Sequence, residues 1–147
     1  MSRNLVFIDS RVADYQRLAN SLAGVSEVHI LDSASDGLLQ MAAHLLGRTD
    51  IDALHVISHG SAGALYLGST LLDSASLSLY RSQLASIGSS LTAPGDLLLY
   101  GCDIAQGDAG QAFIQQLAQI TGADVAASTD LSGSTAAGAN SFLEYRV

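Results

Sequence analysis

Short apolar runs alternate with segments of helical periodicity along most of this 147-residue chain. The runs at 5–8, 27–31, 53–58, 96–100 and 124–127 have the length and composition of strands. Between them, apolar residues recur at helical spacing over 11–22, 36–46, 76–87 and 107–120. This alternation predicts an α/β fold with a mostly parallel sheet and helices on both faces. Right-handed crossovers then determine much of its topology.

Three stretches depart from this alternation. Residues 60–63 are Gly- and Ser-rich and predict a flexible loop, and 64–67 and 70–72 predict a small hairpin around Gly68 and Ser69. Pro94 and Gly95 predict a turn before the strand at 96–100. Near the end of the chain, 128–140 predicts a loop and 142–147 a last edge strand.

Composition narrows the classes of protein and partner. The length fits a single domain spanning 1–147, and 48% hydrophobic residues with 5% aromatics indicate an aliphatic core. A net charge of −8 without a single lysine argues against nucleic acid and anionic membranes as partners. No apolar run approaches the ~20 residues of a membrane span, so we expect no membrane insertion. The first residues are too short and too polar for a signal peptide.

Two predicted strands are followed directly by chemically reactive residues. His59 and Gly60 follow the strand at 53–58, and Gly101 and Cys102 follow the strand at 96–100. Reactive groups of open parallel sheets collect beyond the carboxyl ends of the strands. If these two strands are neighbours, His59 and Cys102 meet there, and a thiol beside an imidazole is an activated nucleophile. The glycines allow a ligand to approach the backbone closely.

Other interpretations of these residues remain open. Cys102 is the only cysteine, which excludes an internal disulfide and leaves a buried inert thiol, a reactive thiol or an intermolecular pair. On a strand, His55 and His59 lie ~13 Å apart, too far to share one metal ion. We therefore expect a supporting or core role for His55, and structural roles for His29 and His44. Phosphate-loop, dinucleotide-binding and calcium-loop motifs are missing, so we expect no cofactor and no metal.

The longer pattern around these strands resembles a known family. The segments LVFID (5–9), DALHVISHGS (52–61), GDLLLYGC (95–102) and TGADVAAS (121–128) together resemble domain of unknown function 4347. The two phrases that end in His59-Gly60 and Gly101-Cys102 are similar to those of caspase-like (clan CD) cysteine peptidases. The resemblance implies a caspase-like, flavodoxin-like three-layer sandwich. It also implies one module of a large bacterial secreted or surface repeat protein of the adhesin type, and hence an extracellular or cell-surface location.

The same resemblance implies roles for individual residues. His59 would be the general base and Cys102 the nucleophile, with no acid needed to complete a triad. The backbone N–H groups of Gly60 and Cys102 would line an oxyanion hole. Asp103 and Asp130 follow the strands at 96–100 and 124–127 and would contribute to a substrate pocket that favours Arg or Lys.

Two functions remain in competition. The first is a cysteine peptidase that cleaves a peptide or protein, its own parent chain included, through the His59–Cys102 dyad. The second is a non-catalytic module that serves adhesion, export or assembly on the same fold. The reactivity of the Cys102 thiol discriminates between them, because a catalytic thiol has a lowered pKa that depends on its histidine.

Overall fold

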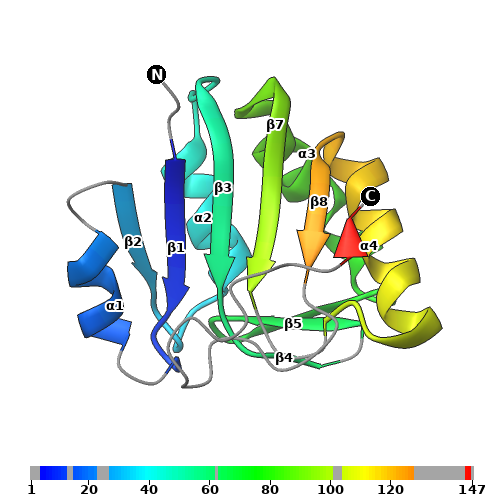
Figure 1. The fold of residues 1–147 in the computed structure, drawn as a ribbon, viewed down its shortest axis with the longest axis horizontal. Coiled ribbons are helices and arrows are strands. Elements are labelled where there is room, and N and C mark those ends of the chain that lie inside the picture. The colour runs from blue at the N-terminus through cyan, green and yellow to red at the C-terminus, as the bar shows by residue number, and fades with distance from the viewer. Residues whose placement is uncertain are drawn as a thin grey trace.

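A six-stranded sheet forms the centre of the protein (Figure 1). The computed structural model describes residues 4–12, 15–22, 27–61, 63–100, 104–127 and 145–146. The strand order is β2-β1-β3-β7-β8-β9, and all neighbours are parallel except β8 and β9. The strands are β1 (Asn4–Asp9), β2 (Glu27–Leu31), β3 (Ile51–Ile57), β7 (Leu91–Tyr100), β8 (Asp124–Ala127) and β9 (Tyr145–Arg146).

Helices cover both faces of the sheet, as the alternation predicts. The chain moves in one direction from β1 to β2 and in the other from β2 to β3, so right-handed crossovers place the connecting helices on opposite faces. Helix α1 (Tyr15–Leu22) therefore packs on one face, against β1 and β2. The other face carries α2 (Gly37–Leu45), α3 (Arg81–Ser89) and α4 (Gly107–Thr121). The order of the first five strands is that of flavodoxin-like sheets, which confirms the predicted α/β class.

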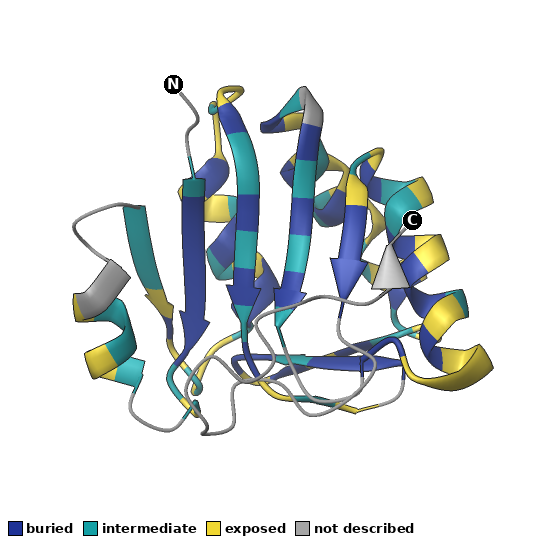
Figure 2. Cartoon of the chain, viewed as in Figure 1, coloured by how far each residue is buried: buried dark blue, intermediate teal, exposed yellow. Residues whose placement is uncertain are grey.

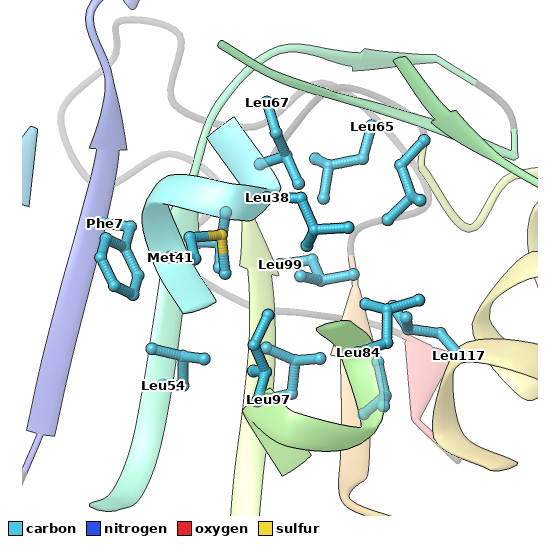
Figure 3. Packing of buried hydrophobic residues seen from close by; sticks show 14 of the residues in the cluster. Phe7, Leu38, Met41, Leu54, Leu65, Leu67, Leu84, Leu97, Leu99 and Leu117 are labelled. Carbon is cyan, nitrogen blue, oxygen red and sulfur yellow. The ribbon is translucent and has the colours of Figure 1, made fainter. Parts of the chain in front are cut away.

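The core lies between the sheet and the three helices α2, α3 and α4. Along β3, Leu54 and Val56 are buried while His55 between them is half-buried, and Leu97 and Leu99 repeat this alternation along β7 (Figure 2). Successive side chains of a strand point to opposite faces, so one face of the sheet is fully buried and the other is less covered. Figure 3 shows the buried face, where aliphatic side chains of the sheet interdigitate with those of α2 and α3.

A second, three-stranded sheet closes this core at the carboxyl ends of the parallel strands. It consists of β4 (Gly60–Ser61), β5 (Ala64–Leu67) and β6 (Thr70–Asp73), all antiparallel. Leu65 and Leu67 of β5 point into the core beside Leu38 of α2 (Figure 3). The hairpin is the one that the sequence predicts. The predicted flexible loop at 60–63 is wrong for its first two residues, because these pair with β5.

Two further predictions need correction. The turn predicted at Pro94-Gly95 lies within β7, whose register against β3 is irregular between Ile51 and Ala53. A proline has no N–H for the ladder, which fits an irregular part of a strand rather than its regular core. The helix predicted at 76–87 begins as a 3-10 turn, η1 (Leu77–Tyr80), and becomes α-helical at Arg81.

The ends of other elements also differ from prediction. The helix predicted at 11–22 is observed from Tyr15, since Asp9 to Val12 form a turn in which the Val12 N–H donates to the Asp9 carbonyl at 3.0 Å. The predicted loop at 128–140 lies outside the described residues, and Tyr145–Arg146 is an edge strand as predicted. Within the described part of the chain, no helix combines the length and apolarity that crossing a membrane requires.

Candidate active site

The carboxyl ends of β3 and β7 lie side by side, which is the condition on which the predicted meeting of His59 and Cys102 depends. Ile57 pairs with Tyr100, and the Ser58 N–H donates to the Tyr100 carbonyl at 2.9 Å. His59 follows immediately. The strand order reverses between β1 and β3, and ligands of open α/β sheets bind in the crevice at such a switch point. The loop after β1 and the loop that carries His59 lie at the carboxyl ends of these strands, beneath the arrowheads in Figure 1.

The imidazole of His59 spans this switch point. Its Nε2 lies 2.9 Å from the backbone carbonyl oxygen of Arg11, which belongs to the loop after β1. A carbonyl only accepts hydrogen bonds, so Nε2 carries a proton in this arrangement. In the neutral ring Nδ1 is then the basic nitrogen. The side chain is exposed to solvent, which leaves the ring accessible to a substrate. Sequence reasoning missed the Arg11 carbonyl, because a backbone acceptor has no side-chain signature.

Gly60 places a backbone donor beside His59. The His59 carbonyl accepts from the Tyr66 N–H at 2.9 Å, so Gly60 and Leu65 form the next, non-hydrogen-bonded pair of the antiparallel ladder. The N–H of Gly60 is therefore directed away from β5. A Cβ on Gly60 would lie 2.4 Å from Cγ1 of Ile104. The close approach that glycine permits here is thus that of the Ile104 side chain, whereas the sequence suggested a ligand.

The predicted nucleophile and the two predicted pocket residues stay predictions. Cys102, Asp103 and Asp130 all lie outside the described residues. On either side of the segment 101–103, the chain is attached to the loop that carries His59. Tyr100 accepts from Ser58, and the carbonyl of the fully buried Ile104 accepts from the Gly63 N–H at 2.9 Å.

His55 lies on the less covered face of the sheet and is separate from His59. Its Nδ1 is 3.2 Å from the Tyr100 hydroxyl, and its Nε2 is 3.3 Å from Oδ1 of Asn4. Burial lowers the pKa of His55, although the charge of Asp96 favours the protonated ring. His55 therefore contacts Tyr100 and Asn4, and its supporting role stays a prediction.

The two remaining histidines contact one another. The rings of His29 and His44 stack with centroids 4.0 Å apart, and Phe7 lies beside both. Nε2 of His29 is 2.7 Å from a carboxylate oxygen of Glu27, and Arg48 donates to the same carboxylate at 2.8 Å. Hydrogen bonds from Arg48 and His29 lower the pKa of Glu27. Of the residues described, no three His, Cys, Asp or Glu side chains are arranged to hold a metal ion.

Comparisons with known proteins give a family and a distant structural likeness. No curated protein matches the chain. Among solved structures, the chain is similar to caspase-1 from Spodoptera frugiperda, with a TM-score of 0.38 and 17% sequence identity. That match covers 69% of this chain and 49% of the caspase chain, so the present chain spans about half the length of its neighbour. The family described as Domain of unknown function (DUF4347) matches residues 5–147, and the chain therefore belongs to this family.

Proposed function

We propose that this protein is a cysteine peptidase whose catalytic pair is His59 and Cys102. The observation that carries the proposal is the hydrogen bond of His59 Nε2 to the Arg11 carbonyl, which leaves Nδ1 as the base at the switch point of the sheet. Cys102 is two residues after Tyr100, and Tyr100 pairs with the strand that leads to His59. Two Cα–Cα steps of 3.8 Å limit how far the thiol can lie from Tyr100.

The proposed reaction proceeds by acyl transfer. Nδ1 of His59 takes the thiol proton, and the Cys102 sulfur attacks the peptide carbonyl carbon to form a tetrahedral intermediate. The imidazolium then gives this proton to the leaving amine as the C–N bond breaks. Water, deprotonated by His59, cleaves the thioester and restores the thiol. The Arg11 carbonyl holds the ring in one orientation through both half-reactions.

The rest of the proposed site follows from the neighbouring loops. The Gly60 N–H, directed away from β5, and the Cys102 N–H stabilise the oxyanion of the intermediate. Asp103 and Asp130 line the pocket and favour Arg or Lys before the cleaved bond. The substrate is a peptide or protein outside the cell, and the parent chain of this module is itself one such substrate.

The rate of Cys102 alkylation as a function of pH tests the pair directly. The chain has one cysteine, so every label is on Cys102. In the native protein we expect fast labelling with a midpoint well below the free-thiol pKa of ~8.5. The His59→Ala variant should return the midpoint to the free-thiol value. Labelling of this variant at pH 7 should be slower by about ten-fold, because a smaller fraction of the thiol is ionised at that pH.

His44→Ala is the matched control, because His44 is also an exposed histidine but stacks on His29 away from β7. Its labelling profile should match that of the native protein. Slow labelling that is unchanged in His59→Ala would contradict the peptidase and favour the non-catalytic module.

A further inference from the structure

Asp9 is a fully buried acid at the end of β1, where its neighbours Phe7 and Ile8 are core residues. Its two carboxylate oxygens accept from two different segments. Oδ1 accepts from the Arg11 N–H at 2.8 Å, and Oδ2 accepts from the Gly68 N–H at 2.6 Å. Buried carboxylates are costly unless their oxygens are paired, so both contacts are needed to keep this side chain in place.

The first contact sets the position of the group that binds His59. Arg11 is the residue whose carbonyl lies 2.9 Å from His59 Nε2. Its N–H is held by the Asp9 side chain, and the next residue, Val12, donates to the Asp9 carbonyl at 3.0 Å. The hydrogen bonds of the Arg11 N–H and the Val12 N–H fix the peptide groups on both sides of Arg11. The Arg11 carbonyl therefore keeps one direction.

The second contact sets the position of His59 itself. Gly68 lies at the turn between β5 and β6, and β5 pairs with β4 directly after His59. The His59 carbonyl accepts from the Tyr66 N–H at 2.9 Å, two residues before Gly68. The hairpin that binds Asp9 at its tip therefore also holds the backbone of His59, through a residue close to that tip.

We infer that Asp9 is a positioning residue of the His59 site, which holds the Arg11 carbonyl and the His59 loop in register across the switch point. The inference rests on the proposed function for its chemical consequence. Asp9 does not touch the reacting atoms. It determines which nitrogen of His59 carries the proton, because the imidazole and its acceptor belong to separate loops that meet at this one carboxylate.

The variant that tests this is Asp9→Asn, which keeps the shape of the side chain and converts one acceptor oxygen into a donor. The amide can then pair with only one of the two N–H groups. We expect the Nε2–H form of His59 to give way to a mixture of tautomers, measured by nitrogen-15 NMR of the imidazole. In the protein with its thiol, labelling of Cys102 at pH 7 should slow at least about ten-fold.

Asp36→Asn is the matched control at the same corner of the fold. The Asp36 carboxylate caps α2 through the N–H groups of Leu38 and Leu39 and accepts from the Tyr80 hydroxyl. The Asp36 backbone forms a β-bridge with Gly68. In Asp36→Asn the amide oxygen still accepts from both cap N–H groups, and the link between Asp9 and Arg11 is kept. The control should therefore leave the His59 tautomer unchanged.

The tautomer is measured in the Cys102→Ser background, so this result does not depend on whether the thiol is activated. If the Cys102 thiol of the native protein is unreactive and the His59 tautomer shifts in Asp9→Asn, the result supports the inference and contradicts the peptidase. An unchanged tautomer in Asp9→Asn, or an equal shift in Asp36→Asn, overturns the inference.

Amide hydrogen exchange in the native protein decides the matter if Asp9→Asn does not fold. Since one carboxylate holds both groups, the amide protons of Arg11 and Gly68 should exchange at one common slow rate. Exchange of the Arg11 amide at the rate of an exposed loop overturns the inference.

Discussion

His55 occupies the less covered face of the sheet, with its ring stacked on Tyr100 at a centroid distance of 5.8 Å. Its two nitrogens have different partners. In the neutral ring with its proton on Nε2, Nε2 donates a hydrogen bond to the Asn4 oxygen, and Nδ1 accepts one from the Tyr100 hydroxyl. Burial of the ring disfavours its charged, protonated form. The side chain that precedes Gly101 and Cys102 thus contacts this half-buried ring.

The pH dependence of stability follows from this arrangement. Burial lowers the pKa of His55 from its ordinary 6.5, so the unfolded chain binds a proton at a higher pH than the folded chain. Stability is therefore present above about pH 6.5 and is lost as the pH falls through the lower, folded pKa. We expect urea denaturation to show a smaller loss of stability from pH 7.5 to 5.5 in His55→Gln than in the native protein.

His44 provides the comparison for this experiment. Burial also lowers its pKa, but its side chain is exposed and the charge of Glu27 opposes the shift. His44→Gln should therefore reduce the pH dependence less than His55→Gln. A pH dependence that is unaltered in His55→Gln would show that this ring is protonated equally easily in both states.

At the scale of elements, the hairpin of β5 and β6 joins the main sheet through close backbone contacts. A Cβ on Gly37, the first residue of α2, would lie 2.4 Å from the Leu67 carbonyl carbon. One on Gly68 would lie 2.2 Å from the Ser35 carbonyl oxygen. The Ser69 N–H also donates to Ser35 at 2.8 Å. These contacts attach the hairpin tip to the start of α2. Because β5 of the hairpin pairs with β4, they also hold the loop that carries His59.

Alanine variants at two glycines distinguish the steric effect of this close approach from the strain of the backbone conformation. Gly68 has φ of 60° and Gly47 has φ of 80°, so alanine is strained by about 1–2 kcal/mol at either position. Nothing lies within 4 Å of a Cβ on Gly47. Gly68→Ala should therefore lower the free energy of unfolding by about 1–3 kcal/mol more than Gly47→Ala, measured by urea denaturation. Equal losses would show that the hairpin does not pack this closely.

At the scale of the whole molecule, one continuous core connects the sheet, three helices and the hairpin. Leu99 lies at its centre, with Leu38 of α2, Leu65 of β5 and Leu84 of α3 lining the same small apolar space. Figure 3 shows these side chains directed toward one another. Because the hairpin contributes to this core, the position of His59 depends on the stability of the molecule as a whole.

Leu99→Ala tests this continuity. Leu99 is 1% exposed, so its truncation should lower the free energy of unfolding by about 2–5 kcal/mol. Leu79 in η1 is 77% exposed, and Leu79→Ala should change stability by no more than about 0.5 kcal/mol. Calorimetry of Leu99→Ala should show one transition at a lower temperature. Two separate transitions would mean that the hairpin unfolds independently of the sheet.

The elements that the sequence predicts best are those with a strong local pattern. The strand at 27–31 and the first strand of the hairpin have the predicted bounds, since their apolar residues and flanking turns lie within a few residues of each other. The predictions that were wrong depend on strand pairing, which the composition of a segment does not show. Gly60 pairs with Leu65 although its own composition is that of a loop, and β7 continues across Pro94-Gly95 because β3 lies beside it.

The same distinction applies to the candidate site. The sequence by itself determines that His59 follows a buried strand and that a second such strand leads to Cys102. Only the tertiary structure decides that His59 meets the Arg11 carbonyl, 48 residues earlier, and that Asp9 binds Gly68, 59 residues later. Periodicity is a property of neighbouring residues, so the chain alone specifies strands and helices. Contacts between loops depend on strand order, which packing of the complete sheet establishes.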